Sequence, residues 1–329
     1  SLYFQALLDQ NSNLTAPHNL NDLFFPAYSA GVHVHINGWG GGPNNYGNNT
    51  AQIDRFVRSY PDFLPIIAAG NNGPKASSLT SEANSKNALV IGACQSVRPA
   101  LSPEASEAGQ VTRFSSQGPT GDGRIKPDLV APGSALVSAC SRLVSSSFAA
   151  NPQYTLMEGS SMGAAVAGGA AGLLRQWFAE AEELAADPSA ALLKAALING
   201  ARREQAAPDF TQGFGVLDLS NTVLALQSDS FLYADEHAGV IDGGVAEYRF
   251  TVREKGTPFK ATLAWTDPAV TAGSTATLVN NLDLQVIDPK GNQYWGNAGL
   301  NRSTQADTVN NVEQVQIPDA QVGEYLVRV

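Results

Sequence analysis

A pair of serines stands directly before an unusual stretch of small residues. Gly159-Ser160-Ser161 precedes residues 162–174, in which glycine and alanine predominate. Ser161 would lie in the first turn of a helix, where unpaired backbone N–H groups and the positive end of the helix dipole favour developing negative charge. That environment suits a serine nucleophile whose attack creates an oxyanion. The motif taken alone favours the alternative, in which one of the serines only caps the helix.

An asparagine that follows an apolar run is a second candidate. Residues 63–69 are mostly apolar, and Gly70-Asn71-Asn72-Gly73 comes next. Ligands in open α/β sheets bind at the carboxyl ends of the strands, which is where Asn71 would lie. Its side-chain N–H could then donate to an oxyanion. A Gly-Asn pair after a strand is more commonly just a turn, so both interpretations stand at this point.

A serine nucleophile needs a base, commonly a histidine that a carboxylate orients. The chain offers His18, His33, His35 and His237. His33 and His35 share one face of a predicted strand and have the spacing of a metal pair, although local pairing of the imidazoles at the core is the favoured interpretation. His18 follows a proline in a predicted loop, and His237 falls in the β-rich part of the chain.

The elements that would position these side chains alternate between helix and strand over the first two thirds of the sequence. Helical spacing is predicted for residues 19–31, 51–60, 161–183 and 189–199, and strands for residues 32–36, 63–69 and 88–93. This alternation predicts a parallel sheet covered on both faces. Residues 162–174 are small or apolar on every side, which predicts a helix that is buried all round.

The pattern changes near residue 228. Residues 246–252, 259–265 and 282–287 alternate with period two and are separated by turn signals, which predicts an antiparallel β-sandwich. We therefore divide the chain into a first domain, 1–228, and a second, 229–329. Tyr294 and Trp295 raise the alternative of a sugar-binding module, against which a half-buried strand pair is the favoured interpretation.

The composition limits the possible partners. The chain carries 20 Lys and Arg against 30 Asp and Glu, a net charge of −10, which argues against nucleic acid and anionic membranes. No apolar run approaches the roughly 18 residues of a membrane span. Only 15% of the residues are charged, a composition that is common in secreted proteins. We therefore expect an extracellular protein, and we expect it to be a monomer. Cys94 and Cys140 form no metal-type cluster, and no catalytic cofactor is expected.

Five blocks of sequence, in their order, resemble the subtilisin-like serine proteases, the subtilases. The blocks are residues 35–41, 68–73, 114–119, 126–133 and 159–162. Further matches at residues 192–198 and 213–217 resemble the family's later helix and its Gly-x-Gly turn. Residues 278–284 and 310–313 resemble the large alkaline proteases that end in a jelly-roll. The resemblance implies an α/β fold with a three-layer, parallel-sheet catalytic domain, followed by an all-β jelly-roll, with both domains incomplete.

The same resemblance implies a serine endopeptidase that acts on a protein or peptide in an extended conformation. Ser161 would be the nucleophile, and the Asn71 side chain would share the oxyanion with the backbone N–H of Ser161. An edge strand would pair with the substrate backbone, and small residues would form one wall of the S1 pocket. The edge strand would be Gly38, Trp39, Gly40 and Gly41, and the wall would be Ala68, Ala69 and Gly70. Trp39 suits core packing equally well.

Two catalytic blocks of the family are missing from this sequence. No Asp-x-Gly block precedes Asn71, and no histidine stands in the family's His-Gly-Thr-His context. The expectation is that both lie upstream of Ser1 and that the chain alone is inactive. The alternative is a non-catalytic homologue that binds peptides or partners. Gly38 and Ala165 also stand where the family usually has serine and proline. The family often binds calcium, so a structural calcium ion is possible, with no site assigned.

Overall fold

The computed structural model describes the whole chain except residues 1, 12, 99, 103–105, 143–144, 149, 181–186, 204–206, 229, 257 and 300–304. Its first part is built on a four-stranded sheet in the order β1-β2-β3-β4, in which each neighbouring pair is parallel. The strands are β1 (Val34–Asn37), β2 (Leu64–Ala68), β3 (Leu89–Cys94) and β4 (Leu129–Pro132). The predicted α/β class with a parallel sheet is confirmed.

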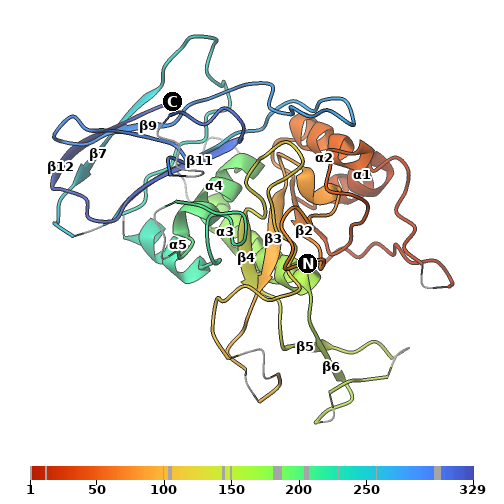
Figure 1. Cartoon of the computed structure of the whole chain (residues 1–329). Helices are drawn as coiled ribbons and strands as arrows, with labels where there is room; N and C mark the ends of the chain where they lie inside the picture. The colour runs from red at the N-terminus through yellow and green to blue at the C-terminus, as the bar shows by residue number, and fades with distance from the viewer. Residues whose placement is uncertain are drawn as a thin grey trace.

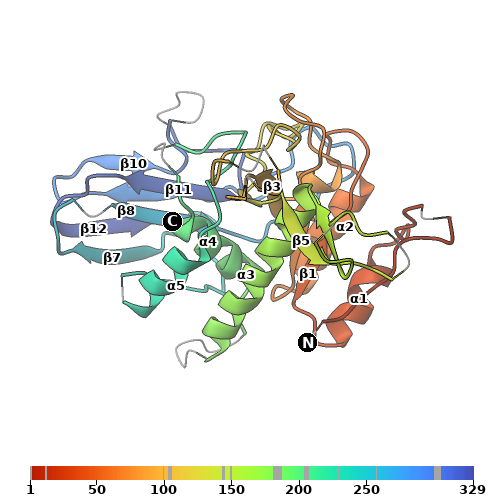
Figure 2. The ribbon, with the colours of Figure 1, turned by 90° about the horizontal axis from the view of Figure 1, so that it is seen from below.

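Helices cover both faces of this sheet (Figures 1 and 2). One layer holds α1 (Asn21–Ser29) and α2 (Asn48–Ser59), and the other holds α3 (Ser160–Glu180), α4 (Ala190–Gly200) and α5 (Leu219–Gln227). Strand β2 contributes side chains to the core on each face of the sheet, because successive side chains point to opposite faces. Ile66 packs in the core that α3 and α4 share, and Ile67 packs in the core beneath α1 and α2. Burial on both faces explains why β2 and β3 read as mostly apolar runs.

Two smaller elements complete the first part. The short 3-10 helix η1 (Glu82–Asn84) follows β2, and the hairpin of β5 (Leu136–Ala139) and β6 (Tyr154–Met157) leads into α3. Figure 1 shows this hairpin projecting from the rest of the molecule.

Helix α3 differs from the prediction on one face. The sequence predicted burial all round, but Val166 and Leu173 are 37% and 59% exposed, and a Cβ on Gly169 or Gly172 would meet no atom within 4 Å. The prediction was wrong for this face because no described segment covers it. Beside it lies β1, which occupies one end of the sheet and pairs only with β2 among the described strands.

The later part contains two antiparallel sheets. One has the order β10-β9-β12-β7, and the other pairs β11 with β8. The strands are β7 (Glu247–Val252), β8 (Phe259–Ala264), β9 (Gln285–Ile287), β10 (Gln293–Trp295), β11 (Val312–Ile317) and β12 (Gly323–Arg328). Their shared core includes Phe259, Val286, Val315 and Tyr325. The jelly-roll and the boundary at residue 228 stay predictions.

The residues proposed for sugar stacking are part of this sheet. Tyr294 and Trp295 lie on β10 and are both half-buried, and Tyr294 packs against the β core. The hydroxyl of Tyr294 donates to Asp288 Oδ2 over 3.3 Å. This is the half-buried strand pair that the sequence favoured.

A buried ion pair joins the two parts of the chain. Lys86 and Asp267 are both 0% exposed, and Lys86 Nζ lies 2.5 Å from Asp267 Oδ2. The ammonium also donates to the carbonyls of Pro268 and Thr277, so all three of its N–H groups are used. Asn87 binds the backbone of Asp267 as donor and as acceptor. The β part is therefore held against the start of β3 by fully partnered polar groups.

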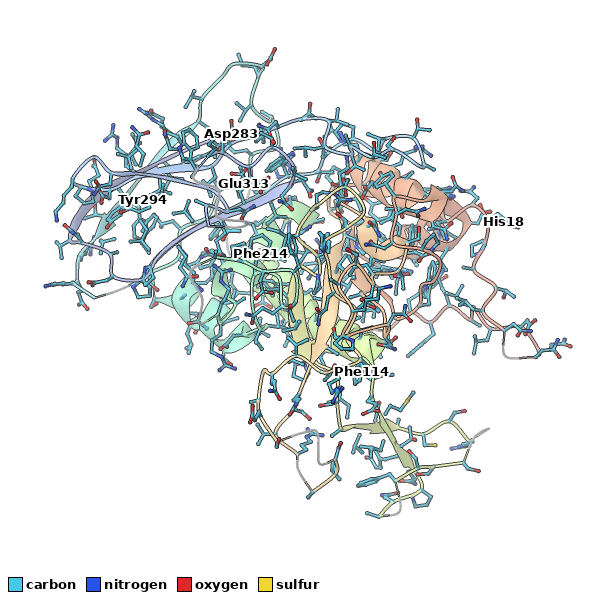
Figure 3. The ribbon with its side chains drawn as sticks, in the orientation of Figure 1. His18, Phe114, Phe214, Asp283, Tyr294 and Glu313 are labelled. Atoms are coloured by element: carbon cyan, nitrogen blue, oxygen red, sulfur yellow. The ribbon has the colours of Figure 1, made fainter. Side chains whose placement is uncertain are left out.

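Glu313 carries a buried carboxyl group that makes the stability of the fold depend on pH. Its side chain is 0% exposed on β11 (Figure 3), and Oε2 accepts a hydrogen bond from Leu284 N over 2.8 Å. Burial raises the pKa of Glu313 to about 9, with smaller contributions from Asp307 and Asp283. Because the folded state binds this proton more tightly than the unfolded state, stability falls as pH rises from about 4.5 towards 9.

Replacing this carboxyl should remove that loss. We expect Glu313→Gln to match the wild type in melting temperature near pH 4.5 and to exceed it by a margin that grows up to pH 9. Differential scanning calorimetry across this range measures the margin. Glu324→Gln, at an exposed site on β12, serves as the matched control and should show no such trend. A margin that is constant with pH would contradict a neutral, buried Glu313.

Candidate active site

A pocket opens where β1 and β2 end and α3 begins. Its volume is about 410 Å³, and it is lined by Gly38, Trp39, Gly40, Gly41, Gly42, Ala68, Gly70, Asn71, Asn72, Thr80, Ser160 and Ser161. Eight of the nine residues that the sequence predicted for the site are in this set. The carboxyl ends of parallel strands meet at one edge of a sheet, so the fold brings these distant segments together.

Ser161 lies in the first turn of α3. The helix begins at Ser160, and Gly159 before it has a φ of +147°, a backbone conformation that favours glycine. Ser161 Oγ donates to the carbonyl of Gly38 over 2.7 Å. A backbone carbonyl is not a base, so this contact holds the hydroxyl without activating it. Among the described residues, no hydrogen bond uses the Ser161 backbone N–H, which therefore remains available at the positive end of the helix.

Asn71 is oriented by Ser160. Asn71 Oδ1 accepts hydrogen bonds from both Ser160 N and Ser160 Oγ, each over 2.9 Å. Because Oδ1 is occupied, the Nδ2 group of the amide is available to a ligand in the pocket. No described residue accepts a hydrogen bond from it. Ser160 Oγ also accepts from Gly70 N over 3.1 Å, and Ser160 is 1% exposed. The site thus presents two unused N–H donors, from Asn71 and Ser161, at a helix N-terminus, an arrangement that can bind a negatively charged oxygen.

Loss of the Ser160 hydroxyl should therefore loosen this arrangement. Ser160→Ala leaves Gly70 N–H without its acceptor and removes one of the two donors to Asn71, so we expect unfolding free energy to fall by about 1–3 kcal/mol. Ser160→Thr keeps the hydroxyl and should lose much less. Urea unfolding of both variants measures the difference, and equal losses would show that the hydroxyl bonds contribute nothing.

The residues predicted as an edge strand, 38–41, lie beyond the end of β1. Strand β1 ends at Asn37, and residues 38–41 form no strand in the structure. The backbone of Gly41 is already occupied, because its N–H donates to Glu82 Oε2 over 3.0 Å and its carbonyl accepts from Ser81 N over 2.9 Å. The N–H of Gly41 is therefore not free to donate to a substrate, whereas its carbonyl keeps a second lone pair. A Cβ on Gly40 would lie 2.9 Å from Thr80 Oγ1, so a larger residue there would have to displace the Thr80 side chain.

Ala69 is the one predicted site residue outside the pocket. It is 0% exposed and packs in the core beneath α1 and α2. Side chains alternate along an extended segment, so Ala68 and Ala69 cannot both face the same cavity. Trp39 meets both predictions, since it lines the pocket and also packs against that core. Thr80 lines the pocket and was missed because it belongs to none of the sequence blocks, whereas Asn72 lies in the block 68–73 but was given no role.

None of the four histidines lines the pocket, and all four are described. His35 packs edge-on against Phe24, its Nε2 lies 2.9 Å from Gln5 Oε1, and burial lowers its pKa to about 4. His33 Nδ1 lies 2.9 Å from Asp62 Oδ2 at the other end of β1. Gly38 lies five residues after His33 along the extended chain, a span of about 16 Å, so this His–Asp pair cannot serve Ser161. His18 is exposed, and His237 Nε2 lies 3.6 Å from Asp235.

The described residues contain no helix that is both long and apolar enough to cross a bilayer.

Comparison with known proteins gives an independent result. The model of the subtilase family, Peptidase_S8, matches residues 3–215. The chain is 29% identical to the serine protease/ABC transporter B family protein tagA of Dictyostelium discoideum, over 97% of this chain and 24% of that protein. It is 32% identical to the serine protease AprX of Bacillus subtilis, over 52% of this chain and 39% of that protein. The chain thus spans about a quarter of the length of the Dictyostelium relative.

Solved structures share the fold at low identity. A serine-to-alanine mutant of the protease domain of PatA superposes with a TM-score of 0.51 at 20% identity, over 68% of this chain and 70% of that one. A lanthipeptide protease superposes with a TM-score of 0.52 at 15% identity, over 67% and 68% of the two chains.

Proposed function

Because the chain belongs to the subtilase family, we propose that it carries the nucleophile and the oxyanion site of a serine endopeptidase. Ser161 is the nucleophile, and the two oxyanion donors are its own backbone N–H and Asn71 Nδ2. The observation that carries this proposal is the double hydrogen bond from Ser160 to Asn71 Oδ1, which turns the donor end of the amide to the pocket that contains Ser161.

The chemistry is acyl transfer in two steps. Ser161 Oγ bonds to the carbonyl carbon of the peptide, and its proton passes to an imidazole and then to the leaving amine as the C–N bond breaks. Water then adds to the acyl-serine ester and gives its proton to the same imidazole, which passes it to Ser161 Oγ as the ester C–O bond breaks. In both steps the carbonyl oxygen becomes negative, and the two N–H donors stabilise that charge more strongly than they stabilise the ground state.

The imidazole and its orienting aspartate belong, in this proposal, to residues upstream of Ser1. Two observations support that position. No described histidine or aspartate lines the pocket, so the proton of Ser161 has no acceptor but the Gly38 carbonyl. The apolar face of α3 at Val166 and Leu173 is exposed, and the neighbouring edge of β1 is unpaired among the described strands, so further strand and helix can pack on this side.

The substrate is a protein or peptide in an extended conformation. Gly38 and Gly40 line the pocket beside Trp39, and because neither carries a side chain, an extended backbone can approach them closely. An extracellular location, a monomeric state and a structural calcium ion, with no cofactor for catalysis, remain parts of the proposal. The second candidate is a peptide-binding homologue without catalysis, which the inactive contact of Ser161 with Gly38 favours.

Expression of the chain together with its upstream residues tests the two candidates. The peptidase proposal expects cleavage of denatured protein that Ser161→Ala abolishes. Binding of the same substrate without cleavage, unchanged in Ser161→Ala, would instead establish the peptide-binding homologue.

A further inference from the structure

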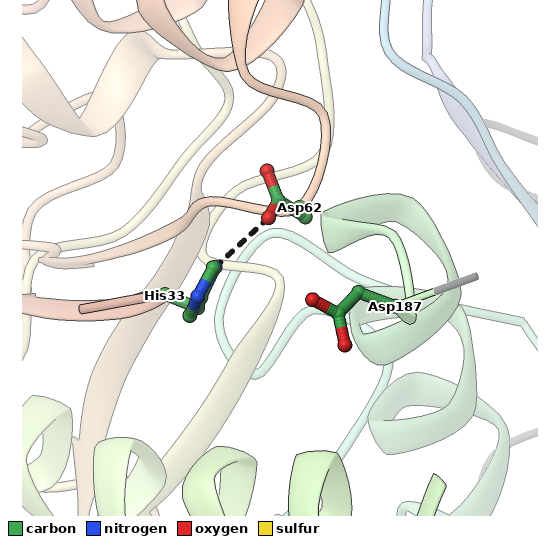
Figure 4. A group of neighbouring side chains, drawn as sticks. All are labelled: His33, Asp62 and Asp187. Carbon is green, nitrogen blue, oxygen red and sulfur yellow. Dashed lines mark ion pairs between the residues drawn. The ribbon is translucent and has the colours of Figure 1, made fainter. Parts of the chain in front are cut away.

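Three potential metal ligands meet at the edge of the sheet opposite the pocket. His33 precedes β1, Asp62 precedes β2, and Asp187 lies between α3 and α4, so three separate segments contribute (Figure 4). One ligand atom from each residue lies within 4.8 Å of the others. From this geometry we infer that His33, Asp62 and Asp187 bind a divalent transition metal of the zinc class.

The distances fit ions of this size. Zinc binds imidazole nitrogen and carboxylate oxygen at about 2.0–2.2 Å, which places two of its ligands about 3.0–3.4 Å apart. His33 Nδ1 and Asp62 Oδ2 are 2.9 Å apart. His33 Nδ1 is buried and forms no hydrogen bond with good geometry, although this oxygen is close. Asp187 is 61% exposed, so its carboxylate can move by the small distance that closes the site.

Neighbouring side chains contact both carboxylates of the cluster, and a net negative charge remains. Tyr28 Oη donates to Asp62 Oδ1 over 3.1 Å, which fixes the carboxylate from outside the cluster. Arg175 Nη2 lies 3.3 Å from Asp187 Oδ2 and offsets one of the two carboxylates. With a neutral imidazole, the cluster keeps a net charge of one negative unit, which favours a cation.

The donor set selects the class of metal. One imidazole and two carboxylates suit zinc and its neighbours, with water completing the coordination on the exposed side of Asp187. Calcium and magnesium prefer oxygen ligands alone, and calcium needs more of them than this cluster offers. Bound metal would join the starts of β1 and β2 to the segment after α3, the helix whose other end carries Ser161.

Zinc titration of the tag-free, chelator-treated chain tests this inference. Isothermal titration calorimetry should give one high-affinity Zn²⁺ per chain, and Co²⁺ in its place should show the visible absorption of a four-coordinate site. Asp187→Ala and His33→Gln should each weaken Zn²⁺ binding by at least tenfold. His18→Gln, at an exposed histidine away from the cluster, should leave the affinity unchanged.

A thermal measurement guards against variants that fold poorly. Zn²⁺ should raise the melting temperature of the wild type, reversibly with EDTA, and should not raise that of Asp187→Ala, whose exposed side chain makes only a surface ion pair. The inference would be overturned by Zn²⁺ affinity that is equal in the wild type and Asp187→Ala, or that falls only in His18→Gln. In that case His33 and Asp62 form a plain ion pair.

Discussion

The chain of residues 1–329 is expected to hydrolyse peptides no faster than its own Ser161→Ala variant. The reason lies in the contacts of Ser161 Oγ, which donates to the carbonyl of Gly38 and has no base beside it among the described residues. All four histidines are described, and none lines the pocket. A serine hydroxyl keeps its proton near neutral pH, and an unassisted hydroxyl is a weak nucleophile.

Initial rates with a fluorogenic peptide mixture measure this, with the longer protein that includes the upstream residues as the positive control. In that longer protein, Ser161→Ala should lower kcat by on the order of 10⁴–10⁶, the range that loss of a triad member produces in serine peptidases. Turnover by the isolated chain that disappears in Ser161→Ala would mean that a base lies within these 329 residues, and the proposed division of the triad would be wrong.

Asn71 should contribute the next largest effect. In the longer protein, Asn71→Ala removes the Nδ2 donor, and we expect kcat to fall by on the order of 10²–10³ with little change in KM, the precedent set by subtilisin-like peptidases. Only kcat should change because the oxyanion exists in the transition state and not in the bound substrate, whose affinity KM reflects.

Asn71→Asp separates catalysis from stability. The aspartate keeps an oxygen for the two hydrogen bonds from Ser160 but has no N–H to donate, so it should lose at least as much kcat as Asn71→Ala and retain more stability. Asn11→Ala, at an exposed residue far along the chain, serves as the control. A kcat in Asn71→Asp within a few-fold of the wild type would remove Asn71 from the oxyanion site.

The sequence could predict those parts of the site that depend on residues close together along the chain. The apolar run before Gly70 marked β2, and the small residues after Ser161 marked α3 and the position of its first turn. Asn71 followed from the rule that sites lie at the carboxyl ends of parallel strands. The family resemblance then identified which serine and which asparagine belong together.

The parts that sequence could not predict depend on contacts between distant segments. The backbone of Gly41 is hydrogen-bonded to Ser81 and Glu82, about 40 positions later, and no local pattern carries that information. Thr80 reaches the pocket for the same reason. The exposed face of α3 was missed because composition reports how apolar a helix is and not what covers it.

His33 illustrates the same point at the opposite edge of the sheet. The spacing of His33 and His35 suggested either a metal pair or local pairing in the core. The structure separates them, with His35 against Phe24 and Gln5, and gives His33 two aspartates that come from other segments. Parallel register brings the starts of β1 and β2 together, and only the path of the chain after α3 adds Asp187.

Labelling of the longer protein by a serine-directed fluorophosphonate tests the central claim most directly. The predicted result is a single phosphonylated peptide containing Ser161, lost in Ser161→Ala, kept in Ser160→Ala, and slowed in Asn71→Ala. Phosphonylation of a different serine in a protein that cleaves peptides would contradict the assignment of Ser161 as the nucleophile.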